Sequence, residues 1–236
     1  MHVRLKPPFW RHDAYTLNSL VAGLRPAIAR LVGAGTLRRD STVIDLGAGD
    51  APYRPLFVPH VAHYLACDIA PAPHIDIVFK PGEKIDQPDG VADCVVSFQV
   101  LEHVWDIAAY LAECRRLLAP GGRLLLSTHG VWLYHPHPTD FRRWTCDGLR
   151  RELEANGFEV VASTPMVGPL AWTTQFRTFA YHHVLSRLGL PGRVLAAVLC
   201  AGMHLRMIVE DAVTPAYLRE TNSAIYLLEA RPRDAG

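Results

Sequence analysis

The chain has 236 residues, of which 50% are hydrophobic and 20% are charged. This length fits one large domain with a core of its own, and the composition excludes a chain that is disordered throughout. Twenty-four Lys and Arg against 23 Asp and Glu leave a formal charge of +1. That balance gives no general attraction for nucleic acid, so we expect no nucleic-acid partner.

The cysteines and the chain start indicate where the protein works. Five cysteines are scattered and none forms a C-x-x-C pair, which argues against a disulfide framework or a structural zinc site. The first eight residues lack the apolar core of a signal peptide. The longest uncharged apolar stretch near the C-terminus, residues 194–203, is shorter than the about 20 residues that span a bilayer. We therefore expect a cytoplasmic protein without a transmembrane segment.

The first forty residues predict helices. Apolar residues recur at helical spacing, with Asp13 as a plausible N-cap, and Pro26 should kink this segment or divide it in two. The apolar stripe consists of Leu17, Leu20, Val21, Leu24, Ile28, Leu31 and Val32.

From Asp40 onward, strands and helices alternate. The β-branched and apolar runs predict strands at residues 42–46, 63–68, 75–79, 92–97 and 123–128. A helix is expected between the last two, with Val104 and Leu111 on its apolar face and Pro120-Gly121-Gly122 after its end. Apolar strands separated by helical segments indicate a parallel sheet that is covered on both faces.

The last third of the chain predicts an insertion before the final strand. A helix over about 145–156 and a strand at 158–161 precede it, and the last strand is expected at 224–228. The helix-rich stretch between them, roughly 169–213, is too long for a simple loop. We expect it to pack over the active edge of the sheet, although its apolar stripe is also suited to meeting lipid or a second subunit.

A glycine turn follows the first strand of the sheet. Gly47 and Gly49 allow a tight turn and a close approach of a ligand to the backbone. Parallel sheets bind ligands beyond the carboxyl ends of their strands, which is where this turn lies. Asp45 precedes the turn, and Asp68 ends the next strand 23 residues later, close to the spacing of a carboxylate that accepts both ribose hydroxyls.

The surroundings of the turn favour S-adenosylmethionine over NAD. Pro52 stands where a dinucleotide site has its third glycine, and Asp50 would repel a pyrophosphate. A sulfonium ligand carries no phosphate to repel. The plainer alternative is a strand-to-helix turn without a ligand, with Asp68 as a solvated cap.

Four segments together resemble the class I S-adenosylmethionine-dependent methyltransferases, in particular the type-11 methyltransferase-domain group. The resemblance covers about residues 40–161 and is carried by residues 43–49 (VIDLGAG), 66–69 (ACDI), 93–104 (DCVVSFQVLEHV) and 117–124 (LLAPGGRL). It implies a Rossmann-like α/β sheet of seven strands, mostly parallel, with the last strand antiparallel.

We therefore expect a single domain over residues 1–236. N-terminal helices take up 1–40, a cofactor-binding core 41–163, a helical insertion or lid 164–222, and the final strand 223–230. The insertion also offers a surface for a possible homodimer.

The resemblance also implies cofactor contacts. Asp68 would bind the ribose, Ile69 would pack on the adenine, and Glu83 is the candidate for the adenine amine. The methionine end would meet Asp45, Gly47, Ala48 and Gly49, and the sulfonium side would face Ser97, Phe98 and Gln99. Arg54 is either a partner of the methionine carboxylate or a surface arginine.

A histidine-rich loop follows the fifth strand, over residues 128–145. His129, His135, His137 and Asp140 are candidates for a general base that takes a proton from an acceptor hydroxyl, since imidazole titrates near neutral pH. The H-x-H spacing also permits a metal site with Asp140, and a purely structural clasp with Trp144 buried is a third interpretation. We favour the base and assign no metal.

The same loop predicts the acceptor side of the pocket. Trp132, Tyr134 and Phe141 can stack on a sugar or aromatic ring, and Arg142 is a further substrate-binding candidate. The loop is similar to that of a sub-group linked to glycans or secondary metabolites. We therefore expect O-methylation of a saccharide or natural-product hydroxyl in a biosynthetic reaction. The alternatives are N- or C-methylation of a secondary metabolite, a non-catalytic cofactor-binding scaffold, and an NAD-dependent oxidoreductase.

Overall fold

The computed structural model describes residues 2–233. The N-terminal half contains α1 (Ala14–Gly33), β1 (Thr42–Leu46), α2 (Arg54–Phe57), β2 (His63–Asp68), β3 (Ile77–Val78), β4 (Ala92–Phe98), the short 3-10 helix η1 (Leu101–His103) and α3 (Ile107–Leu117). The C-terminal half contains β5 (Leu118–His129), α4 (Cys146–Ala155), β6 (Phe158–Met166), α5 (Pro169–Ser186), α6 (Gly189–Val213), α7 (Ala216–Thr221) and β7 (Ile225–Pro232).

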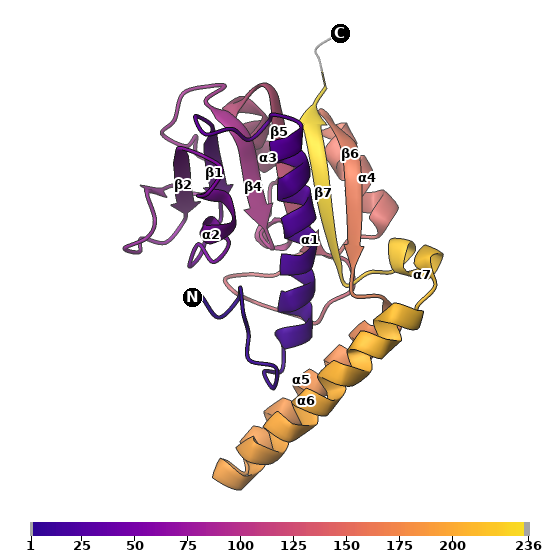
Figure 1. Ribbon diagram of the computed structural model, residues 1–236. Coiled ribbons are helices and arrows are strands. Elements are labelled where there is room, and N and C mark those ends of the chain that lie inside the picture. Colours follow the sequence, from indigo (N-terminus) through magenta and orange to yellow (C-terminus); the bar gives the residue numbers. More distant parts are fainter. Residues whose placement is uncertain (1, 234–236) are drawn as a thin grey trace.

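The strands form one seven-stranded sheet in the order β3-β2-β1-β4-β5-β7-β6 (Figure 1). β1 to β5 pair in parallel, whereas β7 runs antiparallel to both β5 and β6. This confirms the predicted fold class, a Rossmann-like methyltransferase sheet whose last strand is antiparallel. Because parallel strands end at a common edge, Leu46, Asp68, Phe98 and His129 come together there.

The sheet is covered on both faces, as its apolar strands require. α1 crosses one face, and α3 and α4 lie behind the other (Figure 1). Successive strand residues enter opposite cores: Val43 belongs to the cluster that contains α1, and Ile44 to the cluster that contains α3 and α4. Packing on both faces fixes the sheet, and with it the position of the carboxyl ends of its strands.

Some predicted bounds differ from those observed. β3 spans only Ile77–Val78, whereas β6 and β7 extend several residues beyond the predicted strands because they pair with each other along their length. α1 continues through Pro26 as one helix and is not divided there. Asp13 stands at the N-cap position of α1, but its side chain pairs with Arg11 and not with a free N–H of the helix.

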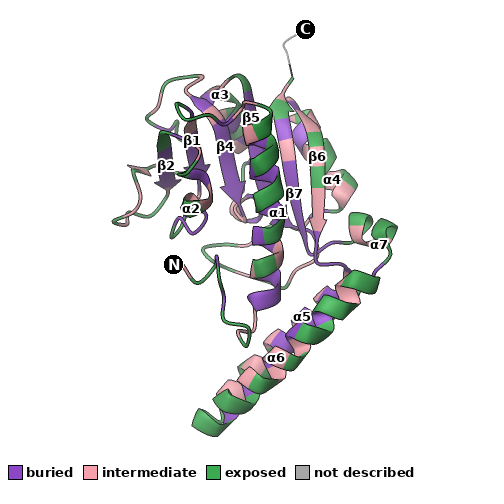
Figure 2. Cartoon of the chain, in the orientation of Figure 1, coloured by how far each residue is buried: buried purple, intermediate pink, exposed green. Residues whose placement is uncertain are grey.

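The insertion folds as an antiparallel hairpin of α5 and α6, which pack mainly against each other. Its base is fixed to the start of α1: Tyr15 donates a hydrogen bond to Asp211 (2.8 Å), and the Gln175 side chain donates one to the His12 carbonyl (2.6 Å). Its outer half projects away from the sheet and is exposed (Figures 1 and 2). Farther in, Phe179 meets Trp132 and His182 stacks on His12. The expectation that the whole insertion packs over the active edge is therefore wrong only for its free end, where Val184, Leu188 and Leu190 are exposed.

α6 is longer than its uncharged stretch indicated. Within residues 2–233, it is the helix that has the length and hydropathy to cross a membrane, with a mean hydropathy of 1.5 over its most apolar 18 residues. Only 28% of that window is buried, because one side of α6 packs on α5 and the opposite side has no partner among the described residues.

Candidate active site

The glycine turn after β1 is built as the sequence predicts. Gly47 and Gly49 have φ angles of 76° and 54°, in the region that favours glycine. A Cβ atom on Gly47 would also lie 2.6 Å from the Val100 side chain. The N–H of Gly47 donates to the Cys67 carbonyl at 2.8 Å, which ties the turn to β2. The result is a stretch of bare backbone at the carboxyl edge.

Asp68 stands beside this turn at the end of β2. Its carboxylate accepts the N–H of Gly49 (2.8 Å) and that of Ala70 (3.2 Å), so its position is fixed while it remains partly exposed. The following Ile69 leaves 45% of its surface exposed as an apolar platform. Glu83 lies in the loop between β3 and β4, where it is exposed and 3.5 Å from Lys80. These positions permit a carboxylate on a ribose and an aliphatic side chain on a flat base.

Asp45 is a buried carboxyl group close to the same turn. It accepts a hydrogen bond from the Tyr64 hydroxyl at 2.5 Å. Burial raises the pKa of Asp45 to about 7, the Tyr64 hydrogen bond opposes the shift, and the charge of Asp68 adds to it. A positively charged ligand beside Asp45 would therefore favour its ionised form.

The turn after β4 contributes one free polar atom. Ser97 is fully buried and bonded to the Tyr110 hydroxyl (2.8 Å), and Phe98 packs against Tyr53 in the core. Gln99 has a φ of 59° and donates its side-chain amide to Ser127 Oγ at 3.0 Å. The side-chain carbonyl oxygen of Gln99, Oε1, is buried and has no hydrogen-bond partner among the described residues. Of the three predicted residues, Gln99 thus offers an unused acceptor.

These groups fit the cofactor that the sequence indicates. Gly47 and Gly49 supply open backbone, Asp45 and Gln99 supply acceptors for a cationic amine, and Asp68 supplies one for a vicinal diol. Arg54 is engaged elsewhere, since its guanidinium lies 3.8 Å from Asp76 and over the Tyr64 ring.

A carboxylate and an imidazole meet at the end of β5. His129 Nδ1 lies 2.7 Å from Glu102 Oε1, and both side chains are almost completely inaccessible to solvent. The other Glu102 oxygen accepts the Thr128 hydroxyl at 2.8 Å. Burial by itself would raise the pKa of Glu102, but the contacts with His129 and Thr128 outweigh it and lower that pKa below its ordinary value. Glu102 is therefore a charged group that faces the imidazole.

Three further histidines follow outward from His129, with His135 as the ring that contacts the others. The His135 ring lies 6.2 Å from that of His129, 5.4 Å from His103 and 5.3 Å from His137, measured between centroids. Burial, followed by its neighbouring imidazoles, lowers the pKa of His135. His103 Nδ1 is bonded to the Thr139 carbonyl, which ties η1 to the loop. The loop thus brings His129, His135 and His137 to one place.

Asp140 holds the loop in shape. It accepts hydrogen bonds from the Arg143 guanidinium (2.5 and 2.6 Å) and from the His135 N–H (2.7 Å). The Arg143 partner lowers the pKa of Asp140. Since both its oxygens are engaged in this way, the carboxylate orients the His135 backbone and not an imidazole ring. In residues 2–233, no three His, Cys, Asp or Glu side chains gather as a metal ion would need.

Of the predicted substrate residues, Trp132 stacks on a histidine ring, whereas Tyr134, Phe141 and Arg142 have other surroundings. Trp132 stacks on His129 (4.8 Å between centroids) and meets Phe176 and Phe179 of α5 edge-on. Tyr134 is 75% exposed on the outside of the loop, and Phe141 packs edge-on against Trp105. Arg142 donates to the Val104 and Trp105 carbonyls at 3.0 Å, and Trp144 is buried. Trp132 is therefore the substrate candidate that contacts a candidate base.

Sequence reasoning missed Glu102, Phe176 and Phe179 as parts of the site. Glu102 lies in η1, just beyond the carboxyl end of β4, which is a signal for a functional carboxylate. Phe176 and Phe179 are three residues apart on α5 and so share a face, but no pattern in the sequence indicates that this face meets Trp132.

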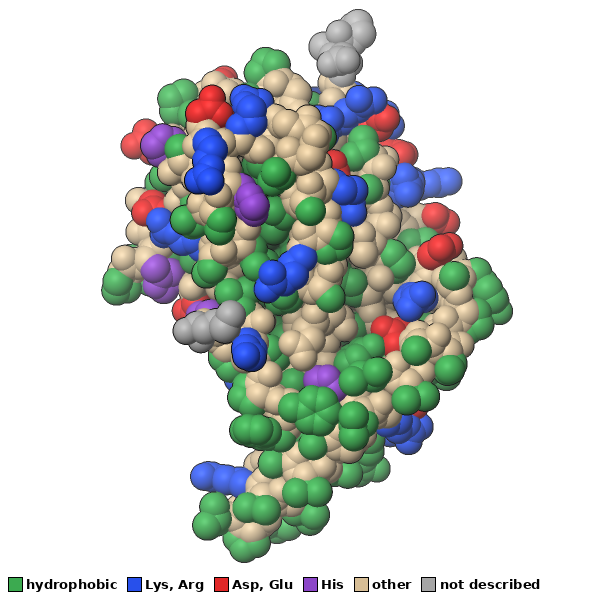
Figure 3. All heavy atoms as spheres, viewed as in Figure 1, with side chains coloured by type: hydrophobic (Ala, Val, Ile, Leu, Met, Phe, Trp, Pro, Cys, Tyr) green, Lys and Arg blue, Asp and Glu red, His purple; other side chains and the backbone are tan. Residues whose placement is uncertain are grey.

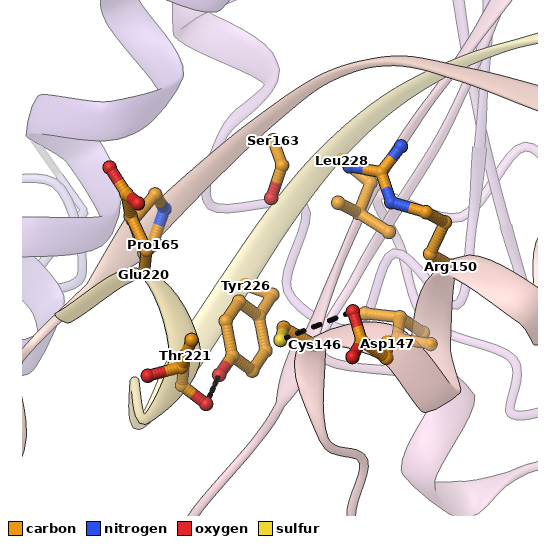
Figure 4. Close-up of a pocket in the computed structure, with 10 residues that line it drawn as sticks. Cys146, Asp147, Arg150, Ser163, Pro165, Glu220, Thr221, Tyr226 and Leu228 are labelled. Carbon is orange, nitrogen blue, oxygen red and sulfur yellow. Dashed lines mark hydrogen bonds between the residues drawn. The ribbon is translucent and has the colours of Figure 1, made fainter. Parts of the chain in front are cut away.

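A separate hollow lies on the antiparallel side of the sheet. This cavity of about 310 Å³ is lined by residues of α4, β6, β7 and α7 (Figure 4). Tyr226 donates its hydroxyl to the Thr221 carbonyl at 2.9 Å on one side of it. It includes none of the predicted site residues, so it gives no support to a site there.

Known proteins resemble the chain over this core. A probable S-adenosylmethionine-dependent methyltransferase of Mycolicibacterium smegmatis is 38% identical over 94 residues, which are 37% of this chain and 37% of that protein. A ubiquinone biosynthesis O-methyltransferase of Dinoroseobacter shibae is 34% identical over 116 residues, 41% of this chain and 47% of that protein. The chain thus matches less than half the length of these relatives.

A solved structure shows the same fold. The 1,6-didemethyltoxoflavin-N1-methyltransferase of Burkholderia thailandensis, with its bound substrate and S-adenosylhomocysteine, superimposes with a TM-score of 0.56. The two are 18% identical, and the match covers 90% of this chain and 79% of that one. The sequence model of the methyltransferase domain matches residues 10–163. By this match and by its fold, the chain belongs to the class I S-adenosylmethionine-dependent methyltransferase family.

Proposed function

We propose that the protein transfers the methyl group of S-adenosylmethionine to a hydroxyl group of a small molecule, a saccharide or natural product. The observation that carries this proposal is the Glu102–His129 pair, which ends β5 at the same edge as Gly47 and Asp68. A candidate base and a candidate cofactor cradle thus share one edge of the sheet.

A hydroxyl acceptor is a weak nucleophile until its proton is removed. The charged Glu102 opposite Nδ1 favours the His129 tautomer that carries its proton on Nδ1. His129 Nε2 is then left with the lone pair that can accept a proton from the acceptor. His135 and His137 remain alternatives for this role, since His135 lies next to His129 and His137 lies next to His135.

The other groups bind and orient. Bound S-adenosylmethionine supplies an electrophilic methyl group on a sulfonium. We assign the ribose to Asp68, the adenine to Ile69 and Glu83, and the methionine end to Asp45 and the 47–49 turn. Gln99 contributes its unused acceptor. Asp140 keeps the loop in shape, so that the histidines are held in fixed positions.

Trp132 is the proposed platform for the acceptor. Its ring stacks on His129 and meets α5, which suits a flat or pyranose ring held beside the base. The O-methyltransferase in the name of the Dinoroseobacter relative supports a hydroxyl acceptor. N-methylation, as in the name of the Burkholderia structure, is the alternative. We further propose that the protein works in the cytoplasm, since the cysteines of the described chain are free thiols.

Two measurements test this function. Thermal unfolding with S-adenosylmethionine, S-adenosylhomocysteine or NAD should show stabilisation by the first two only. Incubation of the enzyme and S-adenosylmethionine with panels of glycosides, phenols and amines should release S-adenosylhomocysteine and give a product heavier by one CH₂ unit. Stabilisation by NAD alone would overturn the cofactor, and methylation of amines but of no hydroxyl compound would overturn the acceptor class.

A further inference from the structure

An apolar face runs along the whole length of α6. Its side chains are between 58% and 74% exposed, and their spacing of four, four, seven, four and four residues keeps them on one side of the helix. They are Leu190, Val194, Val198, Leu205, Val209 and Val213, which we call the α6 stripe. Val184 and Leu188, at the outer end of the hairpin, add 60% and 65% exposed side chains to it. Scattered exposed aliphatic residues are ordinary, but an aligned set of this length is not.

The hairpin is also purely basic over most of its length. Between Glu159 and Glu210 the sequence has no Asp or Glu, and it has four arginines, Arg177, Arg187, Arg193 and Arg206. The whole chain has 24 Lys and Arg and 23 Asp and Glu, so the remainder carries 24 − 4 = 20 basic and 23 acidic residues. The formal charge is therefore +4 on this segment and −3 on the rest. Over the whole hairpin, Pro169–Val213, Glu210 and Asp211 offset two of these arginines, so that its net formal charge is +2. The arginines without an acidic residue nearby in the sequence lie toward its free end.

Both features meet at the free end of the hairpin. Arg187 and Arg193 are exposed there beside Leu188, Leu190 and Val194. Figure 2 shows this end as largely exposed, and Figure 3 shows hydrophobic side chains gathered along the hairpin, with a basic side chain at its end. Nothing in residues 2–233 covers this surface.

We propose that the α5–α6 hairpin docks on the surface of a lipid bilayer that contains anionic lipids. The α6 stripe would lie among the headgroups and upper acyl chains, with Arg187 and Arg193 against lipid phosphates. Aliphatic side chains flanked by arginine are the composition that binds such an interface, and the stripe has no acidic neighbour from Leu190 to Leu205. α6 measures about 37 Å at 1.5 Å per residue, so the whole stripe can lie in the plane of the interface.

Charge is the reason to choose a bilayer over a second copy of the chain. Two hairpins that met with their free ends together would bring like-charged arginines into contact, which disfavours that pairing, whereas an anionic surface attracts them. The attachment at the base favours a surface position over a spanning one, because Asp211 is held by Tyr15 and α5 shields one side of α6.

Vesicle binding tests the proposal directly and does not depend on the methyl acceptor. The full-length protein is mixed with vesicles of phosphatidylcholine alone, or of phosphatidylcholine with phosphatidylglycerol, and the bound fraction is measured by flotation. We expect binding to the anionic vesicles, little binding to the neutral ones, and loss of binding as the salt concentration rises.

Two variants separate the apolar and the charged contributions. Arg187→Gln/Arg193→Gln should weaken binding to anionic vesicles roughly 25-fold, about fivefold for each arginine. Leu190→Gln/Val194→Gln/Val198→Gln should abolish binding that is measurable by flotation. The matched controls, Arg150→Gln/Arg151→Gln on α4 and Val58→Gln/Val161→Gln, change exposed residues away from the hairpin and should bind like wild type.

All variants change exposed side chains, so unchanged thermal unfolding and S-adenosylmethionine binding should show that they fold. Equal binding to neutral and anionic vesicles, or no binding to either, overturns the proposal. So does a wild-type dimer in light scattering that the triple variant turns into a monomer, because the α6 stripe would then be a subunit interface. Failure of vesicle binding would leave the cofactor measurements untouched, so the two proposals fail separately.

Discussion

The carboxyl edge of the sheet has a cofactor side, the glycine turn with Asp45 and Asp68, and a histidine side, the loop after β5. The two sides are assembled differently. On the cofactor side the decisive contacts join residues that are close in sequence: Gly49 to Asp68 and Asp45 to Tyr64 are both 19 residues apart. On the histidine side, His129 meets Glu102 across 27 residues and Trp132 meets Phe176 across 44. The hairpin beyond it is held by a contact between Tyr15 and Asp211, 196 residues apart.

The two sides therefore differ in what a substitution should do. The cofactor side uses backbone geometry and carboxylates whose positions follow from one strand-helix-strand unit, β1-α2-β2, so changes there should affect cofactor binding. The histidine side uses buried side chains from distant segments, so changes there should affect turnover with cofactor binding preserved. Substitutions on the two sides can contradict or refine this division.

His129→Gln should lower kcat about 10²- to 10⁴-fold, because a general base contributes an effect of this size. Glu102→Gln should also lower kcat, since it removes the charge that sets the His129 tautomer. S-adenosylmethionine binding, measured by calorimetry, should remain near the wild-type value for both.

The control for this pair is His63→Gln, an exposed histidine at the amino end of β2. His135→Ala and His137→Ala are assayed beside it. If either loses more turnover than His129→Gln, the base is that residue. If no histidine variant lowers kcat at least tenfold, the loop does not supply a base.

Gly47→Ala should destabilise the fold by about 2–4 kcal/mol, because it combines a left-handed backbone conformation with a clash against Val100. Denaturant unfolding measures this loss. The control is Gly33→Ala at the end of α1, where φ is not positive and no atom lies within 4 Å of an added Cβ. Equal stability of the two variants would show that the turn is not a constrained element.

Asp68→Ala should weaken S-adenosylmethionine binding by about 2 kcal/mol, roughly 30-fold, through loss of charge-assisted hydrogen bonds. Calorimetry provides the measurement, and circular dichroism confirms the fold. Asp40→Ala, which changes an exposed carboxylate just ahead of β1, should leave affinity unchanged. Unchanged affinity in Asp68→Ala would contradict the assignment of the ribose to this residue.

S-adenosylmethionine affinity should rise with pH up to about 7, by at most tenfold per unit, because the ionised Asp45 favours a cationic ligand. The stability of the protein without ligand should depend on pH in the opposite direction. Its Asp45 holds a proton up to about pH 7, whereas the unfolded carboxyl group has a pKa of 3.8, so stability falls as pH rises between these values. Asp45→Asn should remove both dependences, and calorimetry and thermal unfolding across this range check them.

The amino-acid sequence by itself determined the cofactor half of the protein. Alternating strands and helices predict a parallel sheet, and Gly47, Gly49 and Asp68 are placed by chain spacing, because a strand-helix-strand unit with parallel strands leaves few ways to arrange them. It also predicted that the histidine loop lies at the same edge, since that loop follows a strand of the sheet.

Only the tertiary structure decided how the histidine half is used. It paired Asp140 with Arg143 and His129 with Glu102, so that the carboxylate facing an imidazole is a residue the sequence did not single out. It also turned the insertion outward. These outcomes depend on which buried charges find partners and which apolar faces find cover, and such choices are made between segments far apart in the chain.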